Sequence, residues 1–155
     1  MRLGKEPEMH HTAQERNKSL VRKMIEEYFN KRDESSLERY VSADLLDHEL
    51  PPEMPRGLEG FRQYLDGYLK AFPDLFVTIE DVIAEGDKVV VRARYRGTNQ
   101  GDLFGMAATG KCVDYAGIDI VRVQDGMIVE HWGIGDAYTM MTQMGIVPEV
   151  GETAA

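Results

Sequence analysis

A chain of 155 residues is long enough for one domain that encloses a pocket without disulfide bonds. Its formal net charge of -9 argues against binding to nucleic-acid phosphates or anionic membranes, because both require clustered Lys and Arg. No segment has the pattern of a signal peptide or reaches membrane-spanning length, and the single cysteine, Cys112, fits a reducing interior. We therefore expect a cytoplasmic protein.

The domain is expected to span residues 14–147, with a flexible tail at residues 1–13 and a second tail at residues 148–155. The first tail is polar, and its adjacent pair, His10 and His11, is too short to count as a metal-binding tract. No internal repeat or change of composition indicates a second domain.

Three helices are predicted in the first half of the domain. Apolar residues recur at helical spacing over residues 13–31, and a shorter helix follows that Asp33 caps. Residues 44–50 are predicted to be a short extended piece that ends at a Pro-Pro pair. A third helix over residues 58–72 carries a stripe of aromatic and aliphatic side chains and ends before a proline.

A period of two replaces the helical pattern over residues 76–84 and 89–96, which a Gly-Asp turn joins. In the second segment Val91, Ala93 and Tyr95 alternate with arginines, so we expect an antiparallel sheet with one covered face and one polar face. The arginines of this row are expected at a solvated or subunit-facing surface: Arg92, Arg94 and Arg96.

Residues 98–110 form a long connection that glycines interrupt repeatedly. This connection contains Leu103, Phe104 and Met106, apolar groups that a plain surface loop does not need, so it is a candidate cover for a cavity.

The last third predicts a hairpin followed by a helix. Strands over residues 111–124 and 127–135 flank an Asp-Gly turn, and a helical pattern follows over residues 137–144. Asp136 stands between strand and helix, and two interpretations remain open. It either caps the helix by accepting backbone N–H bonds or places a carboxylate in a pocket.

The register of this hairpin decides which side chains share a face. With a two-residue turn, Asp119 lies opposite Trp132. Tyr115 then lies opposite Asp136, on the same side of the hairpin. A bulge near the glycines that follow Trp132 would instead place His131 on the side of Asp136. Both His131 and Trp132 are therefore candidate pocket residues.

Six segments have a characteristic order and spacing between Asn17 and Gly145: residues 71–75, 83–92, 97–105, 109–111, 117–120 and 128–132, with Asp136 after the last. They resemble the SnoaL-like polyketide cyclase branch of the nuclear transport factor 2-like superfamily. This resemblance implies an α+β cone in which N-terminal helices pack on a strongly curved antiparallel or mixed sheet around a cavity. It also implies no metal or organic cofactor, and an Asp near the last strand that acts as acid and base in an intramolecular aldol ring closure.

By position Asp136 matches that Asp, His48 lies where family members carry a polar pocket residue, and Asn99 stands where many relatives have histidine. Such an Asp needs an apolar enclosure that raises its pKa. The candidate donors to the enolate oxygen are His48, which we prefer, His131 and a tyrosine hydroxyl. The competing interpretation of the aromatic stripe is ordinary core packing. The side chains expected to bind substrate are Tyr28, Phe29, Phe61, Tyr64, Tyr68, Phe104, Met106, Tyr115, Asp119, His131 and Trp132.

We therefore expect a cofactor-free cyclase that acts on a polyketide-like or other bulky apolar carbonyl compound. Two alternatives remain: a polyketide hydroxylation accessory or hydrolase on the same cone, and a non-catalytic, dimeric ligand-binding module. A homodimer is expected from the resemblance and from the uncovered sheet face. A metal site is disfavoured, since His48 and Glu49 point to opposite faces of an extended segment.

Overall fold

The computed structural model describes residues 12–151, so residues 1–11 and 152–155 of the two predicted tails lie outside this part. The three predicted helices form, but the first strand of the sheet lies between the second and the third of them, and a last helix follows the sheet. The elements are α1 (Ala13–Ile25), η1 (Glu26–Asn30), α2 (Ser36–Tyr40), β1 (Val41–Asp47), α3 (Gly57–Ala71), β2 (Phe76–Glu85), β3 (Lys88–Thr98), β4 (Cys112–Gln124), β5 (Met127–Gly135) and α4 (Ala137–Met144).

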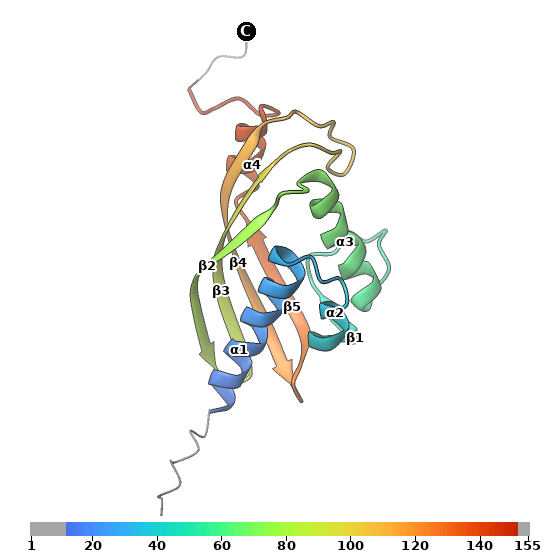
Figure 1. Ribbon diagram of the computed structural model, residues 1–155, viewed down its shortest axis with the longest axis vertical. Helices are drawn as coiled ribbons and strands as arrows, with labels where there is room; N and C mark the ends of the chain where they lie inside the picture. Colours follow the sequence, from blue (N-terminus) through green and yellow to red (C-terminus); the bar gives the residue numbers. More distant parts are fainter. Residues whose placement is uncertain (1–11, 152–155) are drawn as a thin grey trace, which may run out of the picture.

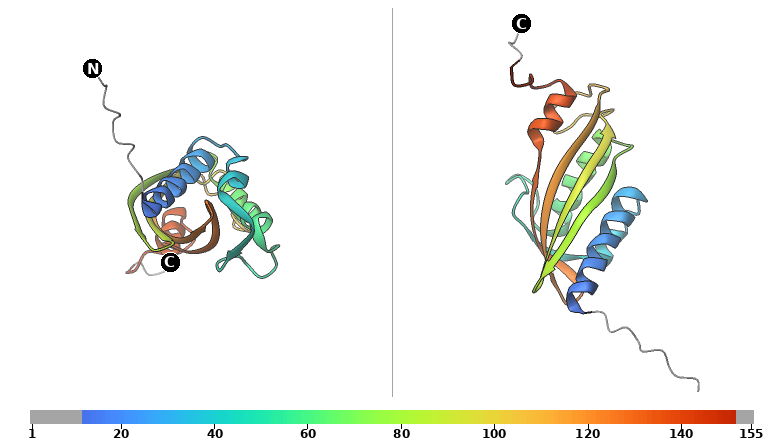
Figure 2. Two further views of the ribbon diagram at one scale, coloured as in Figure 1. Left: turned by 90° about the horizontal axis from the view of Figure 1, so that it is seen from below. Right: turned by 90° about the vertical axis from the view of Figure 1, so that its left-hand side faces the viewer.

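One five-stranded sheet, in the order β1-β5-β4-β3-β2, curls around the helices α1 and α3 (Figures 1 and 2). All neighbouring strands are antiparallel except β1, which runs parallel to β5. The view along the long axis in Figure 2 shows the helices closing the open side of the curled sheet. This arrangement is the α+β cone that the sequence predicts.

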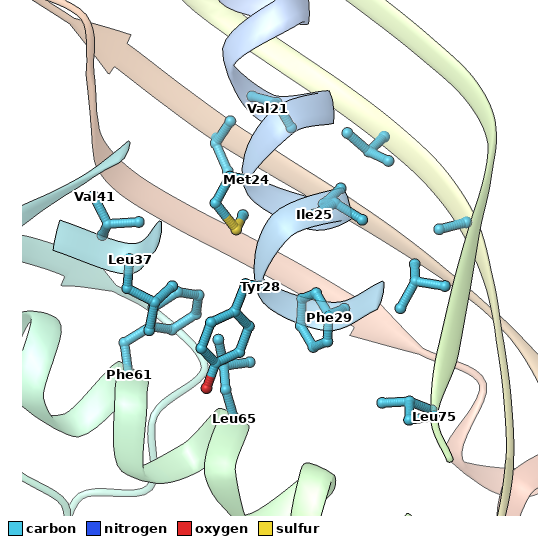
Figure 3. Packing of buried hydrophobic residues seen from close by; sticks show 14 of the residues in the cluster. Val21, Met24, Ile25, Tyr28, Phe29, Leu37, Val41, Phe61, Leu65 and Leu75 are labelled. Atoms are coloured by element: carbon cyan, nitrogen blue, oxygen red, sulfur yellow. The ribbon is translucent and has the colours of Figure 1, made fainter. Parts of the chain in front are cut away.

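Helices α1 and α3 each bury an apolar stripe on the concave side of the sheet. Helix α1 begins where the Thr12 hydroxyl oxygen accepts a hydrogen bond from the Glu15 backbone N–H, and it buries Val21, Met24 and Ile25. The chain continues through the single wide turn η1, which buries Tyr28 and Phe29 beside it. Figure 3 shows these side chains facing those of α3 across the core. Within the described part of the chain, no helix has both the length and the apolar character needed to cross a membrane.

The hairpin of β4 and β5 forms at the predicted turn but contains a bulge at a different place. Gln124 pairs with Met127 as predicted, but the register shifts between Arg122 and Val123. Asp119 consequently lies opposite Gly133, so the predicted pairing of Asp119 with Trp132 is wrong. Because side chains alternate along a strand, this shift turns His131 to the concave face and its neighbour Trp132 to the outer face.

The first strand starts earlier than the extended piece predicted at residues 44–50 and lies at the edge of the sheet, beside β5. Asp47 pairs with His131 in this parallel ladder, and the His48 backbone N–H donates to the His131 carbonyl at 3.1 Å. The pairing brings a carboxylate from the first third of the chain next to the imidazole of the last strand.

Candidate functional site

The concave face of the sheet and the helices α1 and α3 enclose a cavity of about 170 Å³. Its wall is mostly apolar, with aliphatic side chains from α1, α3 and strands β2 to β5. The polar side chains on this wall are Glu49, Tyr64, Tyr68, Tyr95, Tyr115, Asp119 and His131. A mainly apolar cavity with a few polar groups is typical of a small-molecule site.

The imidazole of His131 lies between two carboxylates. Its Nδ1 is 2.9 Å from Asp47 Oδ2, and its Nε2 is 3.0 Å from Asp119 Oδ1. Burial alone would lower the pKa of His131, but the hydrogen bonds to Asp119 and Asp47 outweigh it and raise that pKa to about 9. The imidazole is therefore a cation at neutral pH.

The carboxylate of Asp119 also receives a hydrogen bond from Tyr95. The Tyr95 hydroxyl donates to Asp119 Oδ2 at 2.9 Å, while the other oxygen of Asp119 faces His131. Burial, and then the charge of Asp119, raise the pKa of Tyr95 well above its usual value. Tyr95 thus stays a neutral donor, and Asp119 is held from two sides while it faces the cavity.

Two glycines make room for this close arrangement. A Cβ atom at position 133 would lie 2.5 Å from Asp119 Oδ1 and 3.1 Å from His131 Nε2. A Cβ atom at position 117 would lie 2.8 Å from a ring carbon of Tyr95. Gly133 and Gly117 therefore allow the strands to bring Asp119, His131 and Tyr95 together.

Three further tyrosines place hydroxyl groups around the cavity. The hydroxyls of Tyr64 and Tyr68 are 3.3 Å apart, and the ring of Tyr115 stacks on that of Tyr95 with centroids 5.3 Å apart. Burial raises the pKa of Tyr64 and that of Tyr115 above the usual tyrosine value. Tyr64 and Tyr115 therefore present neutral donors to a ligand with carbonyl or hydroxyl oxygens.

The structure brings many of the residues predicted to bind substrate to this cavity. They come from the helices and from the last two strands of the sheet: Phe29, Phe61, Tyr64, Tyr68, Tyr115, Asp119 and His131.

The expected placement of Asp136 in an apolar pocket is corrected by the structure. Asp136 is exposed and is the N-cap of α4, where its carboxylate accepts hydrogen bonds from the Thr139 backbone N–H at 3.0 Å and the Thr139 hydroxyl at 2.6 Å. These two bonds lower the pKa of Asp136. Asp136 is not part of the cavity wall, so the helix-cap interpretation is the one that the geometry supports.

His48 and Trp132 lie on the outer face of the sheet, so their expected placement in the pocket is also corrected. Their rings stack with centroids 4.9 Å apart, and His48 Nε2 is 2.9 Å from Glu130 Oε1. His48 thus lies across the sheet from His131. Among residues 12–151, no group of three or more His, Cys, Asp or Glu side chains is arranged to hold a metal ion.

Three other predicted residues lie near the cavity but do not line it. Tyr28 is fully buried and its hydroxyl donates to Asp66 Oδ1 at 2.8 Å. Phe104 stacks on the ring of Tyr64 with centroids 5.4 Å apart, and Met106 packs against the core. The connection that contains Phe104 and Met106 therefore covers one part of the wall from outside.

Sequence reasoning missed three polar residues of this site, namely Asp47, Glu49 and Tyr95. Alternation along β3 placed Tyr95 on the covered face, so that signal was available. The direction of Asp47 depends on the parallel pairing of β1 with β5, for which the local sequence carries no signal.

A family model described as SnoaL-like polyketide cyclase matches residues 19–144. Aklanonic acid methyl ester cyclase DauD from Streptomyces sp. (strain C5) is 32% identical over 132 residues, which cover 81% of this chain and 80% of DauD. Aklanonic acid methyl ester cyclase DnrD from Streptomyces peucetius is 30% identical, and the match covers 81% of this chain and 88% of DnrD.

Solved structures share the fold over most of the chain. TsrD from Streptomyces laurentii has a TM-score of 0.79 at 26% identity, covering 88% of this chain and 100% of TsrD. IdmH from Streptomyces antibioticus has a TM-score of 0.72 at 31% identity, covering 83% of this chain and 98% of IdmH.

Proposed function

Because this chain belongs to the SnoaL-like polyketide cyclase family, we propose that it closes a ring by intramolecular aldol addition, with Asp119 as the base and acid. One observation carries the proposal: the Asp119 carboxylate faces an apolar cavity while His131 and Tyr95 hold it from two sides. This placement gives Asp119 the position that a proton-transferring group needs.

The reaction requires two proton transfers and one new carbon–carbon bond. Asp119 removes a proton from a carbon beside a carbonyl group, which gives an enolate and a protonated carboxyl group. The enolate carbon attacks the second carbonyl carbon of the same molecule, and the oxygen of that second carbonyl becomes an alkoxide. The Asp119 carboxyl group returns the proton to that alkoxide. The product is an isomer of the substrate, and each step needs only proton donors and acceptors.

Donors beside Asp119 stabilise the negative charge that moves through these steps. The His131 imidazolium and the Tyr95 hydroxyl both reach Asp119 within 3.0 Å, so positive charge and an O–H dipole lie next to the reacting atoms. In an apolar enclosure these interactions are stronger than they are in water. The hydroxyls of Tyr64, Tyr68 and Tyr115 supply further partners for carbonyl oxygens.

The wall of the cavity favours a largely apolar carbonyl compound. Aliphatic and aromatic side chains make up most of the wall, and carboxylates make up its charged part apart from His131. The names of DauD and DnrD identify aklanonic acid methyl ester as the compound that these relatives cyclise. A polyketide-like ester of this kind is the substrate class that we propose for this chain.

The decisive experiment replaces Asp119 by Asn and measures conversion of aklanonic acid methyl ester and of other polyketide-like dicarbonyl compounds. We expect Asp119→Asn to lower turnover by roughly 10²- to 10⁴-fold, the range typical of a lost general acid or base, without loss of the circular-dichroism spectrum. Asp125→Asn is the matched control, because Asp125 lies in the β-turn after β4, where Asn also tolerates the positive φ of 51°.

The identity of the product separates cyclisation from the alternative functions. A product with the mass of the substrate and a new retention time supports ring closure. A product that has gained water or oxygen would instead indicate a hydrolase or a hydroxylation accessory, and binding without conversion would indicate a ligand-binding module. Wild-type turnover in Asp119→Asn would refute the role of Asp119.

A further inference from the structure

The carboxylate of Asp47 contacts His131 on the edge of the imidazole that does not face Asp119. The Asp47 side chain is only 1% exposed and is not part of the cavity wall, so Asp47 cannot contact a ligand there. Its Oδ2 lies 2.9 Å from His131 Nδ1, and its Oδ1 accepts the Glu49 backbone N–H at 2.7 Å. Both oxygens of Asp47 thus receive donors, which is the environment of an ionised carboxylate.

Strand pairing, rather than a flexible loop, holds Asp47 against His131. The two residues are partners in the parallel ladder of β1 and β5, and the next backbone N–H, that of His48, donates to the His131 carbonyl at 3.1 Å. A side chain fixed from both backbones loses little entropy on forming its hydrogen bond. The imidazole ring is therefore held in one orientation before any substrate enters.

The protonation of His131 follows from the donors and acceptors around its ring. A neutral imidazole has one N–H, so one of its nitrogens would point a lone pair at a carboxylate oxygen. Only the imidazolium donates to Asp47 and Asp119 at the same time. We infer that Asp47 is a positioning residue, which rests on the proposed function: it keeps His131 as an oriented cation that donates to Asp119 during the reaction.

Every element packed around His131 is consistent with this role. Strand β1 contributes Asp47, and β4 contributes Asp119, to which Tyr95 of β3 also donates. Helix α3 contributes the uncharged ring of Phe61, whose centroid lies 5.4 Å from that of the imidazole. Glu49 and Tyr64 line the same cavity, and both leave the imidazole a cation because neither adds positive charge.

This arrangement has a chemical consequence for the reaction. A cation fixed beside Asp119 offsets the charge of the enolate at the moment when Asp119 has taken up the proton. Without Asp47, only Asp119 would oppose the effect of burial on His131, so the imidazole would lose its proton at a lower pH. The neutral ring could then turn its single N–H away from Asp119. Asp47 thus acts through His131, at the far end of a chain of hydrogen bonds from the substrate.

The first test measures the protonation of the His131 imidazole in the protein without substrate. Nuclear magnetic resonance of the imidazole carbons and nitrogens follows the protonation of each histidine, and a His131→Gln variant assigns the signal. In the wild-type protein we expect His131 to stay protonated through neutral pH and to titrate near 9. In Asp47→Asn the midpoint should fall by about one to three pH units. Asp44→Asn, an exposed change on the same strand, should leave it in place.

Two results would overturn the inference. The first is a titration midpoint of His131 at or below about pH 6.5 in the wild-type protein. The second is a midpoint of His131 that is the same in Asp47→Asn as in the wild-type protein. If Asp47→Asn does not fold, the smaller uncharged variant Asp47→Ser repeats the measurement with the same two outcomes. Both readouts are independent of turnover, so they hold whether or not the cyclase proposal survives the Asp119→Asn test.

The second test measures how kcat depends on pH. In Asp47→Asn the alkaline limb of the pH profile of kcat should move down by about one to three pH units with little change in KM, because Asp47 does not contact the ligand. A lower kcat with an unmoved pH profile would show that Asp47 has only a structural role.

Discussion

Gly133 is the residue on which the contact between Asp119 and His131 depends. A methyl group there would lie 2.5 Å from Asp119 Oδ1, so the carboxylate would have to move away from the imidazole. We expect Gly133→Ala to lower turnover by about 10²-fold, the usual cost of displacing a reacting group by about 1 Å.

Gly135→Ala is the control for this prediction. A Cβ atom at position 135 would meet only Tyr115, at an ordinary contact distance of 3.7 Å. The prediction is tested by comparing the turnover of Gly133→Ala and Gly135→Ala in steady-state kinetics. Thermal melting verifies that both variants fold. Equal activity of the two variants would argue against a reaction centre at Asp119.

The sequence predicted some residues of the site because their signals are local. Strand alternation and the turn after β4 indicated Asp119 as a pocket candidate, whereas His131 was a candidate only through a bulge that was expected at a different place. Asp136 was assigned by its position near the last strand, but the structure shows that its carboxylate caps the helix that begins beside it. Asp47 could not be found, because its contact with His131 joins segments that are distant in the sequence.

At the scale of elements, the connection between β3 and β4 is held together by one buried amide. Asn99 is fully buried, its Oδ1 accepts from the Thr109 backbone N–H at 2.7 Å and from the Thr109 hydroxyl at 3.1 Å, and its Nδ2 donates to the Gly101 carbonyl at 2.9 Å. Asn99 is thus a structural residue of this connection and does not line the cavity.

Removing this amide should destabilise the protein. Asn99→Ala removes the three hydrogen bonds that this buried amide makes, so we expect the free energy of unfolding to fall by about 2 kcal/mol in urea titrations. Gln100→Ala, an exposed change at the next position, should alter it by less than about 0.5 kcal/mol. A loss for Asn99→Ala as small as that of the control would contradict the structural role.

An element of the fold could be predicted where its signal lies within its own segment of the sequence. The helices and the four later strands follow from periodicity within each segment, and their bounds agree closely with the structure. The predicted cap of the second helix is an exception, because the N-cap of α2 is Ser35 and not Asp33. The bulge in the last hairpin depends on one extra residue that no turn or glycine signal indicates. That single residue decided whether His131 or Trp132 faces the cavity.

At the scale of the whole molecule, the outer face of the sheet carries apolar side chains that no helix covers. Ile83, Ile118 and Ile134 are exposed there, at 63%, 49% and 79%. The arginines of the face are already paired within the chain, for example Arg92 with Asp81 at 2.7 Å. A face whose charges are neutralised internally can meet a copy of itself without repulsion.

We therefore expect a homodimer that forms through this face. Light scattering coupled to gel filtration should give twice the mass of the chain, and Ile118→Glu should give a monomer because it buries an unpaired charge at the contact. Ile146→Glu, at an exposed position after α4, should remain dimeric. A wild-type mass equal to that of one chain at high concentration would refute the prediction.

The parallel pairing of β1 with β5 also has a consequence for the order in which contacts form during folding. Asp47 and His131 are separated by 84 positions in the sequence, whereas the hairpins β2–β3 and β4–β5 need only neighbouring segments to meet. Contacts between distant segments form late, because a long loop must first be closed. We therefore expect Asp47 to reach His131 only when β1 pairs with β5, after Asp119 and His131 have met within their hairpin. A molecule in which β1 is not yet paired would lack the carboxylate that orients His131.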